Sequence, residues 1–396
     1  MIKTLTAFFR RHSANRRPRI DRLPVLAVLA ALSFAPTAAI AAETTCRGES
    51  LMPALSQSGA MASVEAKAAK VSNGEGRFFR IEKAGLAPSY LLGTMHLGDP
   101  RLLALPEPID RAFEDSQRLV IETTDVLDPM KMAGAMFADP ALTTLPKGQT
   151  LGDFLKPADR QKLARMLDAK GVPLQAVERL QPWFLSSGFM LPACMAKTSG
   201  GMPIVLDTSL AARAKAAGIP VEGLETASEQ LRSMAAIPMK EQIDGFVALL
   251  SAEDRLDDIF ETMIDLYLRE HVSTIMPAIE AAVPDGGMMV GAGEGYAAFE
   301  EKVITERNLR MADRLEPFLS KGGSFVAVGA LHLPGEKGLV ALLRARGYRL
   351  VRVPAPVGAA PARPHLDDAE AAQSGAPSRP EPAGAPRESD ADDTKK

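Results

Sequence analysis

Two histidines of this sequence share a local setting in which they could act together. Residues 90–97 read YLLGTMHL and residues 325–333 read FVAVGALHL, although the chain has only five histidines. A short apolar run of this kind is typical of a buried strand, and a glycine three residues before a histidine lets another segment or a ligand approach closely. His96 and His332 are therefore the first candidates for chemistry.

Each of these histidines is followed by a helix and a second strand. After His96, the segment PEPIDRAFEDS has Pro108 where it can open a helix, and RLVIETTD predicts a strand with Glu122 near its end. After His332, the segments GLVALLRARG and YRLVRV repeat the helix and the strand. We predict two pseudo-duplicated strand–Gly-x-x-His–helix–strand units in a central sheet, with both histidines at the carboxyl edge, where open α/β sheets bind ligands.

The remaining segments predict an α/β fold of α+β character. RFFRIE (77–82) and SYLLGTM (89–95) flank a turn and predict a hairpin that enters the sheet. Residues from about 126 to 316 mostly carry helical spacing, with one short strand at IPVEGLET. We therefore expect one domain over residues 43–354, with a large helical insert at about 126–316.

Two imidazoles and one carboxylate at a shared edge could hold a divalent metal. His96 and His332 would be metal ligands, and Glu122 would be a third ligand or the general base. Zn²⁺, Mn²⁺, Co²⁺ or Fe²⁺ would accept this donor set. A metal lowers the pKa of the water that it binds to near neutrality, so that this water can attack an amide or ester carbonyl. The alternatives are metal-free hydrolysis, with a histidine as base and Glu122 orienting it, and ligand capture without turnover.

Several further polar residues could take part. Arg307 lies in the charged helical segment EEKVITERNLRMADRLEP and could stabilise an oxyanion, grip a substrate carboxylate, or form only a surface ion pair. Glu225, Glu229 and Gln230 could reach the site from the end of their strand, or cap the helix that follows. His271 lies among polar neighbours of a helical segment, and we expect it to be structural or exposed.

Five features in order resemble the TraB/PrgY/GumN family, whose animal relatives are the TIKI proteins. The likeness extends from about Cys46 to Val353, and its features are Gly93-Thr94-Met95-His96, Glu122, GLETASEQ, ERNLRM and Gly329-Ala330-Leu331-His332. The resemblance implies that His96, His332, Glu122 and Arg307 form the site of a metal-dependent peptidase. It also implies a fold like those of erythromycin esterase and the ChaN haem-binding proteins, although no tyrosine here stands in a recognisable haem motif.

The two ends of the chain predict an exported protein with a disordered tail. Residues 1–42 have the basic start, the apolar stretch LPVLAVLAALSFA and the A-x-A site of a Sec-type signal peptide cleaved near Ala41/Ala42, so we expect a periplasmic or secreted protein. A twin-arginine route and a retained anchor are the alternatives. We expect no transmembrane helix in the mature chain and a disordered tail, rich in proline and alanine, over residues 355–396.

Composition narrows the class of partner. The net charge of −3 gives no electrostatic footprint for nucleic acid. The family resemblance implies a peptide as the substrate, and a small molecule is the alternative. The two cysteines, Cys46 and Cys194, could form a disulfide in an oxidising compartment, or remain as thiols.

Overall fold

The computed structural model describes residues 48–190, 198–199, 202–283 and 294–355. The predicted signal peptide, both cysteines and the chain from residue 356 lie outside these ranges. The chain divides into two compact units at residue 43, and all described residues belong to the second unit.

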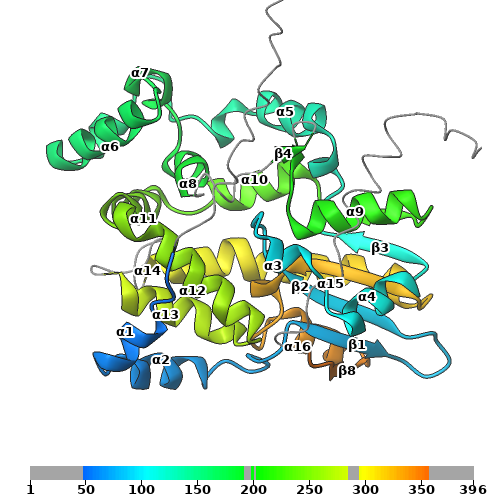
Figure 1. The fold of residues 1–396 in the computed structure, drawn as a ribbon. Coiled ribbons are helices and arrows are strands. Elements are labelled where there is room, and N and C mark those ends of the chain that lie inside the picture. The colour runs from blue at the N-terminus through cyan, green and yellow to red at the C-terminus, as the bar shows by residue number, and fades with distance from the viewer. Residues whose placement is uncertain (1–47, 191–197, 200–201, 284–293, 356–396) are drawn as a thin grey trace, which may run out of the picture. The chain divides into compact units, whose positions relative to one another are not determined.

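The second unit contains a six-stranded mixed sheet in the order β6-β3-β7-β2-β1-β8. Figure 1 shows this sheet on one side of the unit, with β1, β2, β3 and β8 labelled. Its strands are β1 (Phe78–Glu82), β2 (Ser89–Thr94), β3 (Arg118–Ile121), β6 (Val221–Gly223), β7 (Ser324–Gly329) and β8 (Arg349–Arg352). A separate two-stranded sheet consists of β4 (Thr198–Ser199) and β5 (Met202–Pro203). The predicted α/β class is confirmed, as is the hairpin, because β1 pairs antiparallel with β2.

The two predicted strand–helix–strand units share the large sheet. The first runs from β2 through α4 (Glu107–Glu114) to β3, and the second runs from β7 through α16 (Leu339–Ala345) to β8. Strand β7 lies between β2 and β3 and pairs in parallel with both, while β3 also pairs in parallel with β6. Four neighbouring strands therefore end at the same edge.

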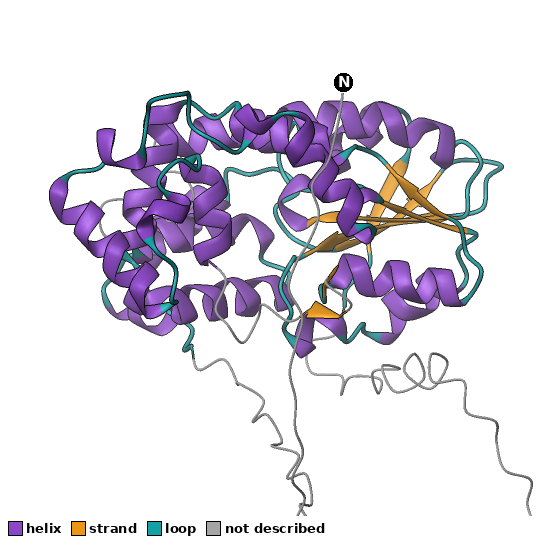
Figure 2. Ribbon diagram, turned by 90° about the horizontal axis from the view of Figure 1, so that it is seen from above, coloured by secondary structure: helices purple, strands orange, loops and turns teal. Residues whose placement is uncertain are grey.

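Alternate residues of β7 contact two different cores, because successive side chains of a strand point to opposite faces. Phe325 and Ala327 face α4 and α9 (Leu206–Ala216), whereas Val326 and Val328 face α15 (Glu306–Leu319) and α16. Helices thus cover both faces of the sheet (Figure 2). Double coverage explains why the β7 sequence is continuously apolar rather than alternating.

The other helices pack beside the sheet, most of them around a third core. They are α1 (Met52–Gln57), α2 (Met61–Ala68), α3 (Pro100–Leu103), α5 (Pro129–Ala138), α6 (Pro157–Ala169), α7 (Leu174–Val177), α8 (Pro182–Met190), α10 (Ala227–Ala235), α11 (Met239–Ser251), α12 (Leu256–Leu268), α13 (Ile275–Ala282) and α14 (Glu294–Phe299). Met95 and Ala330, both in the histidine motifs, belong to this core. Of the helices in the described residues, none has the length and apolar character needed to cross a membrane.

Tyr267 of α12 connects the helical core to the first histidine motif. Its side chain is fully buried, and its hydroxyl donates a hydrogen bond of 2.7 Å to the carbonyl of Gly93. A buried carbonyl that loses its partner has no water to replace it. The helical part of the unit thereby holds the strand end that carries His96.

We expect Tyr267→Phe to lower the free energy of unfolding by about 1–3 kcal/mol, because it removes the partner of the Gly93 carbonyl. Tyr348→Phe is the matched control, since the Tyr348 hydroxyl donates to Glu316, whose side chain is 42% exposed and also pairs with Lys83. Urea titration of both variants checks this. An equal or larger loss in Tyr348→Phe would contradict the role given to Tyr267.

Candidate functional site

Each of the four neighbouring parallel strands delivers one polar residue to the shared edge. These residues are His96 after β2, His332 after β7, Glu122 after β3 and Glu225 after β6. The register aligns the strand ends, because Thr94 pairs with Gly329 and Ile121 pairs with Ala327 and Gly223. Residues that are far apart in the sequence therefore converge at one place.

Glu122 is the centre of this cluster. Its Oε1 atom lies 3.9 Å from Nε2 of His96 and 3.7 Å from Nε2 of His332. The same oxygen accepts a hydrogen bond of 2.7 Å from the backbone N–H of Gly329. The structure therefore brings His96, His332 and Glu122 together, as the sequence predicted for their strand ends.

The second oxygen of Glu122 is held by two further side chains. Arg307 donates to Oε2 at 2.6 Å and Gln230 donates to it at 3.1 Å. Burial alone would raise the pKa of Glu122, but Arg307 and the two histidines outweigh burial and hold this pKa well below its usual range. Glu122 is therefore an ionised carboxylate.

Arg307 is itself fixed by a second glutamate. Its Nε and one terminal nitrogen donate to Oε2 of Glu225 at 2.9 and 2.7 Å, and Arg310 donates to the other Glu225 oxygen at 2.8 Å. The side chain of Glu225 is completely buried. Arg307 thus binds two carboxylates. Of the roles open from the sequence, this arrangement favours an ion pair that holds Glu122 over contact with an oxyanion or a substrate carboxylate.

Asp207, in the first turn of α9, holds the ring of His96. One of its oxygens lies 2.9 Å from Nδ1 of His96, and the other accepts from the hydroxyl of Thr94 at 2.9 Å. The carboxylate raises the pKa of His96 to about 9, against the opposing effect of desolvation. Because the His96 side chain is 56% exposed, solvent screens this pair.

His332 is held by a neutral partner instead. Its Nδ1 lies 2.7 Å from Oδ1 of Asn308, whose amide nitrogen donates to the carbonyl of Lys337 at 2.9 Å. That second bond identifies the Asn308 oxygen as the atom facing His332, so Nδ1 carries the hydrogen and Nε2 presents a lone pair toward Glu122. Burial lowers the pKa of His332 to about 3.

The two motif glycines are needed for close approach, as the sequence predicted. A Cβ atom at Gly329 would lie 3.2 Å from Oε1 of Glu122 and 3.6 Å from Nε2 of His96. At Gly93 it would lie 2.9 Å from the Cα of Ala330. Gly329 therefore leaves space within the site, and Gly93 lets the second motif pack against the first.

The sequence allowed the three polar residues of the ETASEQ segment either to reach the site or to cap the next helix, and the structure divides them between these roles. Glu229 caps α10 through a capping box with Thr226, whereas Glu225 and Gln230 reach the site. His271 is exposed and pairs with Glu75 at 2.7 Å, as expected, but it follows α12 rather than lying within a continuous helix.

Three residues around the histidines had no role in the prediction from the sequence. Asp207 opens a helix in the predicted insert, and only the fold brings it near His96. Asn308 directly follows Arg307, and Thr94 lies inside the first motif, so position was the one available signal for each.

The described residues contain no group of three or more histidine, cysteine or acidic side chains arranged as a complete metal site. The Nε2 atoms of the two histidines and Oε1 of Glu122 form a more open arrangement than ligands around a bound ion. They nonetheless offer the mixed nitrogen and oxygen donors that first-row transition metals accept.

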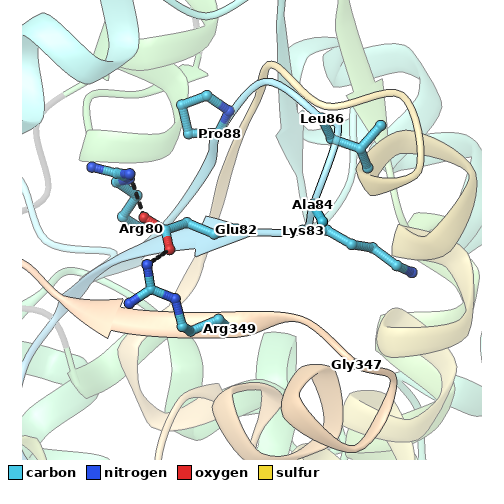
Figure 3. Close-up of a pocket in the computed structure, with 8 residues that line it drawn as sticks. All are labelled: Arg80, Glu82, Lys83, Ala84, Leu86, Pro88, Gly347 and Arg349. Carbon is cyan, nitrogen blue, oxygen red and sulfur yellow. Dashed lines mark ion pairs between the residues drawn. The ribbon is translucent and has the colours of Figure 1, made fainter.

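A surface hollow lies at the opposite edge of the sheet. It adjoins the turn between β1 and β2, and Figure 3 shows Glu82 paired with Arg80 and Arg349 at its wall. Lys83 lies over the ring of Tyr348. Because these charged groups already have partners and lie away from the histidines, this hollow is not part of the site.

The site and fold agree with the sequence relatives. The sequence profile of the TraB/PrgY/gumN family matches residues 78–352, a range that includes both histidine motifs, and the chain belongs to this family. The family resemblance read from the motifs is thereby confirmed.

Individual relatives are distant. Metalloprotease TIKI2 of Danio rerio is 24% identical over 311 residues, covering 67% of this chain and 58% of that protein. Metalloprotease TIKI1 of Danio rerio is 24% identical over 310 residues (68% and 61%), and the uncharacterized protein YbaP of Shigella flexneri is 24% identical over 263 residues (65% and 88%). This chain thus spans about three fifths of the length of the two zebrafish proteins. No solved structure gives a match.

We expect Glu229→Gln to lower the free energy of unfolding by about 1–2 kcal/mol at pH 7, because Glu229 accepts two bonds from Arg314 at 2.8 and 2.7 Å. Those bonds lower the pKa of Glu229 from 4.5 to about 2. A carboxyl group whose pKa is lower in the folded state than in the unfolded state stabilises the fold at pH values above its unfolded pKa. The difference in stability between the variant and the wild type should therefore disappear as the pH falls from 4.5 toward 2.

Urea titrations across this pH range check the prediction. Asp244→Asn is the control, since Asp244 pairs with Lys240 on the exposed surface of α11 and should contribute less than about 0.5 kcal/mol. A Glu229→Gln difference that stays constant down to low pH would contradict the electrostatic explanation.

Proposed function

We propose that this protein is a metal-dependent hydrolase that cleaves peptide bonds. The observation that carries the proposal is the convergence of His96, His332 and Glu122, with both Nε2 atoms within 4 Å of one carboxylate oxygen. The two zebrafish relatives, both named as metalloproteases, support the same reaction class. The predicted signal peptide supports action in the periplasm or outside the cell.

The donor set fits a divalent cation. Each histidine uses Nδ1 for a protein partner, Asp207 or Asn308, so Nε2 is the nitrogen left to bind a metal. Histidine ligands of metals usually donate their other ring nitrogen in this way. The lowered pKa of Glu122 supplies the deprotonated carboxylate that a cation requires. His96, His332 and Glu122 are thus the proposed ligands, for Zn²⁺, Mn²⁺, Co²⁺ or Fe²⁺.

A bound cation would supply Lewis-acid chemistry, because it polarises a carbonyl and makes water more acidic. The protein's own groups would do the rest. Arg307 and Gln230 keep Glu122 ionised and oriented, and the exposed His96 forms the side from which substrate and water can enter. The buried His332, only 4% exposed, forms the closed side. The substrate is therefore expected to lie against the His96 ring.

Metal-free hydrolysis is a second candidate, favoured by the contrasting environments of the two histidines. His332 is buried beside a neutral amide and stays uncharged, whereas His96 is paired with a carboxylate and holds a proton more tightly. Groups whose pKa values are separated in this way can act as a base and an acid. A chelator distinguishes the candidates, because it would abolish metal-dependent turnover and leave metal-free turnover unchanged.

We expect the full chain, after loading with Zn²⁺, Mn²⁺ or Co²⁺ and dialysis, to retain near-stoichiometric metal by elemental mass spectrometry. His96→Ala, His332→Ala and Glu122→Gln should each weaken metal binding. The loss should exceed the about 10–100-fold that follows when a residue hydrogen-bonded to a metal ligand is removed. The matched control is His271→Ala, because His271 pairs only with Glu75 on the surface.

Circular dichroism confirms that each variant is folded, and a peptide library with the retained metal then tests turnover. Absence of metal from the wild type, or equal loss in His271→Ala, would contradict the metal proposal. Metal binding without any product from peptides or esters would instead favour ligand capture.

We expect Gly329→Ala to reduce metal affinity or turnover by about tenfold or more, because its methyl group would press against Oε1 of Glu122. The backbone of Gly329 has a φ of −51°, which alanine readily adopts, so the fold should survive. Gly134→Ala is the control: apart from its chain neighbours and the backbone of its own helix, none of the described atoms lies within 4 Å of the added methyl group, and helix α5 should gain stability. Equal activity in both variants would contradict the packing argument.

A further inference from the structure

We infer that Asp207 and Thr94 are positioning residues that fix the ring of His96 for the reaction proposed above. The inference rests on that proposed function. It concerns the one histidine of the pair that burial does not hold in place, since the His96 side chain is 56% exposed and that of His332 is 4% exposed. An exposed ring can rotate unless its neighbours hold it.

The Asp207 carboxylate joins both residues with its two oxygens. Oδ1 accepts from the hydroxyl of Thr94 and Oδ2 lies 2.9 Å from Nδ1 of His96. An ionised carboxylate has only acceptors to offer, so Nδ1 carries the hydrogen of this bond. Nε2 is then the nitrogen that faces Glu122. Asp207 thereby determines which nitrogen of His96 is available to a ligand.

Thr94 makes this arrangement rigid. It is the last residue of β2, is 2% exposed, and pairs in register with Gly329 of β7. Its hydroxyl therefore has a fixed position relative to the sheet and orients the carboxylate of Asp207, a residue that is itself 6% exposed. A series of contacts thus links the sheet to His96 through Thr94 and Asp207.

This arrangement gives helix α9 a role in the site. Asp207 is 111 positions away from His96 in the sequence and belongs to the segment predicted as a helical insert. The N-terminal turn of α9 reaches the histidine because the helix packs on the face of the sheet formed by Leu92, Phe325 and Ala327. The insert thus supplies a hydrogen-bond partner to the first motif and does more than cover the sheet.

The first test is metal affinity of the full chain, measured by calorimetric titration with Zn²⁺ and Co²⁺. Asp207→Ala should weaken binding by about 10–100-fold, the loss typical of a partner hydrogen-bonded to a ligand. Thr94→Val, which removes only the hydroxyl, should also weaken binding, whereas Thr94→Ser restores the donor and should bind as the wild type does. Asp128→Ala is the control, because the side chain of Asp128 caps the start of α5 by accepting from Met130 and Lys131, and its loss should affect stability alone.

The second test needs no metal. In the ¹⁵N-histidine NMR spectrum of the metal-free chain, His96 and His332 should each show an Nδ1–H signal protected from solvent exchange. Asp207→Ala and Thr94→Val should lose protection at His96 and keep it at His332, whose partner Asn308 is unchanged. His96→Gln assigns the signal.

The two tests separate the inference from the proposed function. A wild type that binds no metal overturns the proposed function, and the NMR result then decides the positioning role alone. Thr94→Val with wild-type metal affinity and an unchanged His96 signal overturns the inference, even if its melting temperature falls, because that result assigns Thr94 a structural role only.

Discussion

The site depends on a single buried carboxylate. Glu122 is 8% exposed, and an ion that has left water at such a position needs compensating charges and hydrogen bonds. Arg307, Gln230 and the backbone N–H of Gly329 provide them, each from a different element. Removal of any one would leave a buried charge with fewer partners, and such loss is more costly than the intact pair is stabilising. The geometry of the site and the stability of its surroundings are therefore linked through Glu122.

The parallel sheet makes this concentration of polar groups possible. Strands β2, β7, β3 and β6 are adjacent and end together, so each can place one side chain at the same edge. Helices on both faces exclude water from the strands, but they leave the edge open on the side of His96. The duplicated Gly-x-x-His motif fits this arrangement, because β2 and β7 are neighbouring strands and each ends in one copy of the motif.

The sequence predicted the parts of the site that lie at strand ends. Apolar runs identified β2, β3 and β7, and parallel topology then implied that His96, Glu122 and His332 would meet. The sequence could not predict the residues that orient them, because the position of Asp207 depends on how α9 packs against the sheet. Nor could it show that Arg307 binds two carboxylates, since Glu225 reaches it only through the pairing of β6 with β3.

The helical region was predictable in type but not in its contribution to the site. Its helices follow from apolar spacing and capping residues, as at Thr226 and Glu229 of α10. Its contacts with the histidine motifs, such as the bond from Tyr267 to Gly93, depend on tertiary packing between segments 174 positions apart. Such a contact cannot be predicted from the local pattern of the sequence.

We propose that His96, His332 and Glu122 bind one metal ion. The most direct test is an anomalous difference map, recorded at the cobalt absorption edge, from crystals of the full chain grown with Co²⁺. We expect a single strong peak between the two Nε2 atoms and Oε1 of Glu122, with Asp207 and Asn308 still bonded to the Nδ1 atoms. A peak elsewhere, or no peak at this edge of the sheet while Co²⁺ is bound at other positions, would contradict it.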